Sequence, residues 1–383
     1  MKTTLFLSVF SFLSLILTPA ARAEQASTEE LKPMMNQNFA TILELQEIAA
    51  SPESFRKAAN YAKIVALIDR LEGIAHVMPE VTGATRPGLS AVASVYSEYL
   101  ADLKEAAKSG NPVYLRNRIR TATGFCFECH TSSATGKTFR DGGRRLDALK
   151  LTPFQKAEFL AATRQFDKAI SLYQDILAKE PSVAARSTEL PHAVRNALTI
   201  AVRVKQDPKL AQEILDRVHA RKDLSGFFRG QIEAWKKDVG EWKREKSLDP
   251  SAPAVSWLEK ARRLVDRAQT LQTYQADHAG DVSYLRAVSF AQETLARPTT
   301  PEQKAEALRI LGVSHSVLED PLLWNLDEYY LEACVTGLPH SETAKKCFDR
   351  WLQETTFGFS GSQGLDLPPD MPARIDRLRE LAE

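Results

Sequence analysis

Apolar residues recur three and four positions apart along most of the chain, which is the spacing of one face of a helix. Near the amino terminus this pattern predicts four helices, separated by short breaks of Gly, Pro, Ser and Asn. We find no sustained alternation of apolar and polar positions flanked by hairpin turns, so a sheet is not expected. The sequence therefore predicts an all-α fold that opens with an antiparallel four-helix bundle over residues 33–50, 53–75, 90–107 and 112–129.

The first residues have the pattern of a secretion signal. Lys2 supplies a positive start, residues 5–17 are largely apolar, and Ala21-Arg22-Ala23 fits a small-x-small cleavage site. The apolar run is shorter than the ~20 residues that span a bilayer, and no later segment is long and apolar enough. We therefore expect residues 1–23 to be a cleavable signal peptide and the mature product to be periplasmic, with no membrane span; the alternative is an uncleaved anchor.

Composition and charge narrow the classes of protein further. The chain of 383 residues is 44% hydrophobic and 26% charged, which is ordinary for globular proteins and gives room for about two or three domains. Its net charge is +1, and loss of the signal peptide removes Lys2 and Arg22 but no acid, which leaves −1. This balance excludes a nucleic-acid protein that works through bulk positive charge. Four cysteines in so long a chain do not form a disulfide scaffold.

The end of the fourth predicted helix carries the sharpest chemical signal, Cys126-Phe127-Glu128-Cys129-His130. Cys-x-x-Cys-His is the attachment sequence of c-type haem. Residues three and four apart share a helix face, so two thiols can reach the vinyl groups while the imidazole faces the iron. A thioredoxin-like redox pair would require a βαβ setting, and a zinc site would require a second Cys-x-x-Cys pair. The sequence has neither. We therefore expect one covalent haem c held through Cys126 and Cys129, with His130 as an axial ligand.

A four-helix bundle that ends in this motif resembles the class II cytochromes c, which include cytochrome c prime and its low-spin relatives. The resemblance covers residues 24–138 and rests on the order of parts: an early helix with Met, three more helices, then the haem motif. Two departures are visible. Leu31 stands where the family often has Arg, and residues 131–137 replace the family's basic ending, which suggests that the chain turns away into another domain.

In that family the second axial position lies on the first helix, as Met in low-spin members and as an apolar blocker in five-coordinate ones. Met35, with Ile42 seven residues later, matches the family's register best, so the resemblance implies Met35 as the second iron ligand. The alternative is that Met35 is core filler and leaves the iron open to NO or CO. Lesser candidates are Met34, Met78 and His76, while three arginines either pair with haem propionates or form a solvated face: Arg116, Arg118 and Arg120.

Beyond a polar linker at residues 137–145, the chain resembles tetratricopeptide repeats (TPR). Residues 151–181 carry Ala157, Leu160, Ala169, Tyr173 and Pro181 at spacings close to those of the 34-residue repeat. Degenerate units follow at residues 207–218 and 326–339, the latter preceded by Leu311-Gly312. We expect an irregular array of helical hairpins over residues 141–353, after a haem bundle over residues 24–140. The array either offers a concave protein-binding surface or merely packs on the bundle.

Cys334 and Cys347 flank a helix-breaking loop at residues 337–340. In an oxidising compartment a disulfide that clamps this hairpin is expected, and two buried free thiols are the alternative. Residues 357–364 are rich in glycine and aromatics but lack the spacing of a phosphate loop or a nucleophile elbow. We expect residues 354–383 to be a tail that packs on the repeats.

These features predict an exported mono-haem c-type cytochrome that transfers electrons and docks a periplasmic redox or other protein partner through its repeats. The alternative is a five-coordinate haem protein that binds or senses NO or CO and is coupled to the repeat domain. No catalytic constellation beyond the haem is visible, so an enzyme such as a peroxidase ranks third. Because members of the resembled family are often dimers, the resemblance leaves a homodimer open.

Overall fold

The computed structural model describes residues 19–132, 138, 151–178, 189–274, 277–318, 323, 325–362 and 364–383. Almost all of these residues lie in helices, and the strands among them are a two-residue pair, β1 (Ser360–Gly361) and β2 (Gly364–Leu365). The all-α prediction is therefore confirmed. The apolar part of the predicted signal up to residue 18, the linker apart from residue 138 and the predicted boundary at residue 140 lie outside the described residues.

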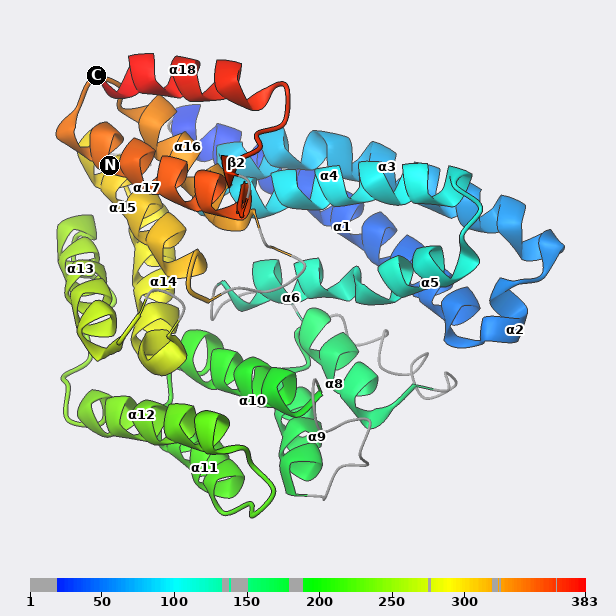
Figure 1. Cartoon of the computed structure of the whole chain (residues 1–383), viewed down its shortest axis with the longest axis horizontal. Helices are drawn as coiled ribbons and strands as arrows, with labels where there is room; N and C mark the ends of the chain where they lie inside the picture. The colour runs from blue at the N-terminus through cyan, green and yellow to red at the C-terminus, as the bar shows by residue number, and fades with distance from the viewer. Residues whose placement is uncertain are drawn as a thin grey trace, which may run out of the picture.

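The first part of the chain forms long helices that pack side by side (Figure 1). Tyrosines and branched aliphatic side chains of these helices fill a shared core. The helices begin where a residue fixes the first turn: Ser51 and Asn111 each accept a hydrogen bond from the backbone three residues on, and Pro follows each of them. The elements are α1 (Pro19–Ala50), α2 (Pro52–Phe55), α3 (Ala58–Thr85), α4 (Pro87–Lys108), α5 (Pro112–Thr121) and α6 (Thr123–Thr131).

Several helix boundaries differ from the predicted ones. The first helix begins at Pro19, ahead of the predicted start at residue 33, and the second predicted helix is interrupted at Arg56 and Lys57, between α2 and α3. The second predicted helix continues through Pro79 to Thr85, so the loop expected before α4 shrinks to Arg86. The fourth predicted helix is split at Ala122 into α5 and α6.

The split has a specific cause in the side chain of Tyr99. Its hydroxyl donates to the carbonyl of Arg118 at 2.5 Å, and Thr121 Oγ1 donates to the same carbonyl at 3.1 Å. The amide of Ala122 bonds to the carbonyl of Ile119 instead, at 3.4 Å. A side chain from another helix therefore takes the acceptor that would have continued the α-helical ladder.

The rest of the chain consists of helices that mostly pair as hairpins. Ala157, Leu160, Ala169 and Tyr173 of the first hairpin are all buried. The helices are α8 (Pro153–Ala162), α9 (Phe166–Ala178), α10 (Glu189–Thr199), a π-helical turn η1 (Ile200–Val204), α11 (Pro208–His219), α12 (Gly226–Trp242), α13 (Ala254–Leu271), a 3₁₀ turn η2 (His278–Gly280), α14 (Asp281–Leu295), α15 (Pro301–His315), α16 (Leu326–Gly337), α17 (Glu342–Gly358) and α18 (Met371–Ala382).

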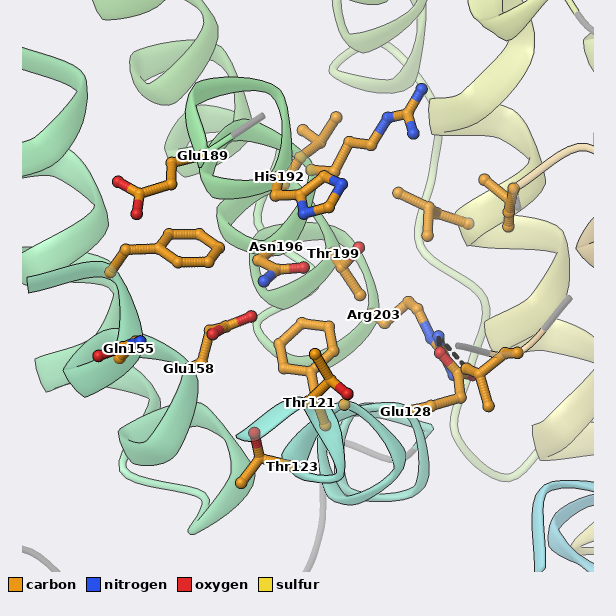
Figure 2. A pocket seen from close by; sticks show the side chains of 18 of the residues that line it. Thr121, Thr123, Glu128, Gln155, Glu158, Glu189, His192, Asn196, Thr199 and Arg203 are labelled. Atoms are coloured by element: carbon orange, nitrogen blue, oxygen red, sulfur yellow. Dashed lines mark hydrogen bonds and ion pairs between the residues drawn. The ribbon is translucent and has the colours of Figure 1, made fainter. Parts of the chain in front are cut away.

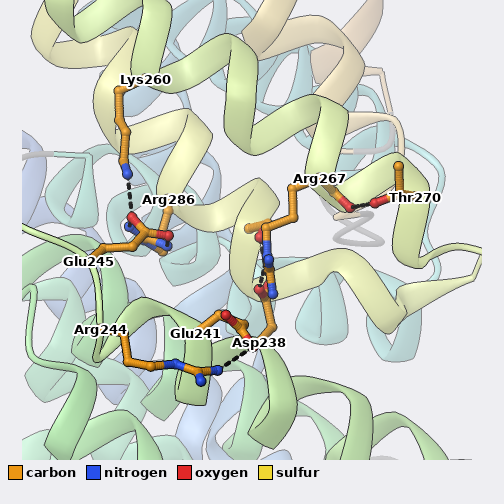
Figure 3. A network of polar contacts seen from close by, with 9 residues as sticks. Asp238, Glu241, Arg244, Glu245, Lys260, Arg267, Thr270 and Arg286 are labelled. Atoms are coloured by element: carbon orange, nitrogen blue, oxygen red, sulfur yellow. Dashed lines mark hydrogen bonds and ion pairs between the residues drawn. The ribbon is translucent and has the colours of Figure 1, made fainter.

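These hairpins are held together by close packing and by ion pairs. A Cβ on Gly312 of α15 would lie 2.6 Å from Leu331 Cγ of α16, so the absence of a side chain permits the close approach of the two helices. Figure 3 shows the polar contacts among α12, α13 and α14. Asp238 Oδ1 accepts a hydrogen bond from Arg267 Nε at 2.6 Å, and Arg286 Nη2 lies 2.7 Å from Glu245 Oε2.

The last helices return to the bundle. In Figure 1 the hairpins run from α8 and α9 through α11–α13 to α14–α18, and α16 comes to lie beside α4. The hydroxyl of Tyr330 on α16 donates to Gly88 O at 2.7 Å, and Gln292 Nε2 on α14 donates to the same carbonyl at 2.9 Å. Buried side chains of α13–α18 belong to the same hydrophobic core as those of α1, α3 and α4. The bundle and the carboxyl-terminal helices therefore share a core.

Candidate functional site

The predicted haem motif lies on α6, which sits between the bundle helices and the first repeat helices α8 and α10 (Figure 1). Successive residues of a helix turn by about 100°, so Cys126, Cys129 and His130 point to one side of α6. Both cysteines are half-buried, unbonded to each other, and packed against the core of the bundle. Close by, Phe125 packs on the rings of Tyr96 and Tyr99 at centroid distances of 5.3 and 4.7 Å.

The surroundings of the two thiols disfavour their charged form. Burial raises the pKa of Cys126 to about 12, and burial together with the charge of Glu128 raises the pKa of Cys129. Catalytic redox pairs have lowered pKa values, typically because a thiol lies at a helix N-terminus or beside a cation. Cys126 and Cys129 instead lie in the middle and near the end of α6. The geometry does not resemble a thioredoxin-like pair.

His130 is held by a backbone acceptor that the sequence does not predict. Its Nδ1 lies 2.5 Å from the carbonyl oxygen of Ala162, the last residue of α8. A carbonyl at the end of a helix lacks an intrahelical partner and can only accept, so Nδ1 carries the hydrogen and Nε2 carries the lone pair. Burial lowers the pKa of His130 to about 4. The imidazole is therefore neutral at neutral pH, in the tautomer that suits a metal ligand.

The turn between α8 and α9 also holds the backbone of His130. Arg164 in this turn has a φ of 58°, a left-handed conformation that costs a non-glycine residue about 1 kcal/mol or more. The turn is closed by the amide of Gln165, which donates to Leu160 O at 2.8 Å. From this position Arg164 Nη1 donates to the carbonyl of His130. Two groups of the α8–α9 hairpin therefore hold the last residue of the predicted haem motif.

Met35 lies on the same side of α1 as the core of the bundle. It is half-buried and packs against the hydrophobic core that Cys126 and Cys129 also contact. Asn38, nearly one turn further along α1, accepts a hydrogen bond at 2.9 Å from the hydroxyl of Tyr96, which also lies near Cys126. Met35 therefore remains the prediction for the second axial position.

The lesser candidates have other surroundings. Met34 is half-buried like Met35, Met78 is 4% exposed within the bundle core, and His76 is exposed. Arg116 donates to the carbonyls of Ala49 and Ala50, at 2.7 and 3.2 Å, and so caps the end of α1. The other two arginines lie apart from each other. The guanidinium carbon of Arg118 lies 3.8 Å from the centroid of the Tyr99 ring, and Arg120 lines a cavity on the other side of α6.

That other side of α6 carries a buried ion pair. Glu128 Oε1 lies 2.8 Å from Arg203 Nη1 and 3.8 Å from His315 Nε2. Burial opposes ionisation, but the charge of Arg203 holds the pKa of Glu128 below its ordinary value. Arg203 belongs to the π-helical turn η1, so this pair joins the haem motif to the repeat hairpins. Glu128 occupies one of the two x positions of Cys-x-x-Cys-His, which the motif leaves open. A charged residue at that position was the one sequence feature that pointed to a buried ion-pair partner.

The donor set on α6 fits a c-type haem. Two thiols lie nearly one helical turn apart, and a neutral imidazole with a fixed tautomer follows them directly. A haem iron takes most of its ligands from the porphyrin, so one or two side chains complete its coordination. Within the described ranges, no group of three or more His, Cys, Asp or Glu side chains could hold a metal ion.

The second cysteine pair is joined in the structure. Cys334 of α16 and Cys347 of α17 form a disulfide, and both residues are fully buried. The bond links the two helices of the α16–α17 hairpin.

No protein-family model, curated protein or solved structure matches the chain. No helix in the part of the chain that the structure describes is long and apolar enough to cross a bilayer.

Proposed function

We propose that the protein is an exported mono-haem c-type cytochrome that transfers electrons. The observation that carries the proposal is the hydrogen bond from His130 Nδ1 to Ala162 O, which prepares Nε2 of a Cys-x-x-Cys-His histidine as a metal ligand. Cys126 and Cys129 would hold the haem through thioether bonds, His130 would bind the iron, and Met35 would supply the second axial ligand. When bound, the haem would supply a one-electron couple at its iron.

The residues around the motif have properties that suit an electron carrier. The bond to Ala162 O orients the imidazole and makes it a stronger donor to a metal. Tyr96 and Phe125 are buried, and their rings pack on each other in the core against which the two cysteines lie, so they keep water from the inner part of this side of α6. A dry, rigid surrounding lowers the reorganisation that accompanies a change in charge, which is what a carrier requires.

The helical hairpins support a docking role more weakly. Stacked helical repeats generally leave extended surfaces that bind proteins. The carboxyl-terminal hairpins also pack on the bundle, through contacts such as Tyr330 to Gly88, and this supports a role in holding the bundle. We propose a periplasmic redox protein as the partner, docked on the hairpins that do not contact the bundle.

The absorption spectrum of oxidised and reduced protein, with and without CO, tests the proposal. The chain is made with its signal in a bacterium that matures c-type cytochromes. A low-spin spectrum that CO leaves unchanged supports the carrier. A high-spin spectrum that shifts with CO supports the five-coordinate gas-binding alternative. A product with no haem band contradicts both.

A further inference from the structure

A cavity of about 480 Å³ lies behind the haem motif, on the side of α6 away from the cysteines (Figure 2). Phe127 and Glu128 of α6 line it, whereas Cys126, Cys129 and His130 do not. Its other walls come from α5, α8, α10, η1, α14 and α15, with Phe154 as a second aromatic surface. Asn196 and Thr199 of α10 present polar side chains to the same space (Figure 2).

Arg203 lines this cavity and carries buried hydrogen-bond donors that no described residue uses. Its side chain is 1% exposed, and its Nη1 donates to Glu128. Its Nε and Nη2 have no acceptor among the residues that the structure describes. These two nitrogens form the side-on edge of the guanidinium, whose parallel N–H groups match the two oxygens of a carboxylate. Buried donors without an acceptor are costly, so this edge suits an acceptor that the described residues do not supply.

The backbone that carries Arg203 is itself unusual. It lies in the π-helical turn Ile200–Val204, and single π-helical turns inside helices are frequent at functional sites. A second arginine, Arg195 of α10, lines the same cavity and also has a buried Nε without an acceptor among the described residues.

The charges around the cavity limit the ligand. Glu128 neutralises the charge of Arg203. Arg195, beside Asp281, and Arg120 supply two further positive charges. Glu158 and Glu189 line the end away from Arg203 (Figure 2). A second carboxylate in the ligand would meet these acids, whereas an apolar body would lie against Phe127 and Phe154.

We propose that this cavity binds a small organic monocarboxylate, whose two oxygens accept hydrogen bonds from Nε and Nη2 of Arg203. A carboxylate could also come from a haem propionate. The cavity lies on the opposite side of α6 from the tethering cysteines, so the geometry favours a free ligand.

Titration calorimetry on the full mature chain tests the proposal, with butyrate and benzoate as probes. The neutral amides butyramide and benzamide are matched controls, because they keep the shape and lose the charge. We expect saturable binding of both carboxylates, with the amides and the dicarboxylate succinate bound at least about tenfold more weakly. Equal binding of the amides, or no binding of either carboxylate at tens of millimolar, would overturn the proposal. This result needs only the native chain.

Arg203→Lys keeps the charge beside Glu128 and removes the side-on edge, so it should weaken benzoate binding at least about tenfold. Arg286→Lys is the control, because Arg286 is an equally buried arginine whose Nη1 and Nη2 both bond to Glu245 elsewhere. Unchanged affinity in Arg203→Lys, or an equal loss in both variants, would contradict the assignment.

The double variant Cys126→Ala, Cys129→Ala separates the two sources of carboxylate. A free ligand predicts the same affinity for benzoate in the native and the double-variant chains. Binding that appears only in the variant would mean that the haem's own propionate fills the site, and would overturn the proposal of a free ligand.

Discussion

The two sides of α6 differ in where their partners come from. On the side with Cys126, Cys129 and His130, all three functional groups come from five consecutive residues, although Ala162 O orients the imidazole. The side with Glu128 is defined by Arg203, 75 positions away, and by His315 on α15. The chemistry of a short motif can therefore be read from the sequence. The residues that surround the motif are brought together only by the fold. The predictions below test whether the two sides are separable.

The largest effect is expected from Cys126→Ala together with Cys129→Ala. Removing both thiols removes the only proposed tethers, so covalent haem should be lost completely, as measured by haem staining of a denaturing gel. The control is the pair Cys334→Ala, Cys347→Ala. That pair should keep the haem and lower the free energy of unfolding by about 3 kcal/mol, because it opens the disulfide between α16 and α17.

Met35→Ala should change one ligand and leave attachment intact. If the thioether binds the iron, its removal should convert a low-spin, CO-insensitive spectrum into a high-spin spectrum that shifts with CO. Met34→Ala, on the adjacent position of α1, is the matched control and should leave the spectrum unchanged. The assignment fails if Met35→Ala has no spectral effect.

Glu128→Gln tests the other side of α6. It leaves the buried charge of Arg203 without its carboxylate, so we expect a loss of about 3 kcal/mol in the free energy of unfolding by urea. Haem attachment should be unaffected. Glu233→Gln removes an exposed carboxylate that pairs with His219 at 3.3 Å and should cost less than about 1 kcal/mol. Equal losses in the two variants would mean that the buried pair contributes nothing special.

His315 makes the stability of this side depend on pH. Burial lowers its pKa from 6.5 to about 4, although the charge of Glu128 opposes the shift and that of Arg203 adds to it. The unfolded chain therefore takes up a proton first, and stability is lost as the pH falls from about 6.5 towards 4. His315→Gln should reduce the stability difference between pH 7 and pH 4.5 by about 2 kcal/mol. His219→Gln is the control, and an identical pH profile for His315→Gln and the native chain would refute the claim.

The helical periodicity was sufficient to predict the fold class, because each helix presents its own apolar face. It did not predict the break at Ala122, since that break depends on the Tyr99 hydroxyl of another helix. Spacing alone also placed Cys126, Cys129 and His130 on one side of α6. The carbonyl of Ala162 could not be predicted, because a backbone acceptor 32 residues away carries no signal in the sequence.

Intact-mass spectrometry of the mature chain, made in a host that matures c-type cytochromes, tests the central claim most directly. We expect the mass of the polypeptide from residue 24 onward plus one haem that survives denaturation. A mass equal to that of the polypeptide alone would contradict it.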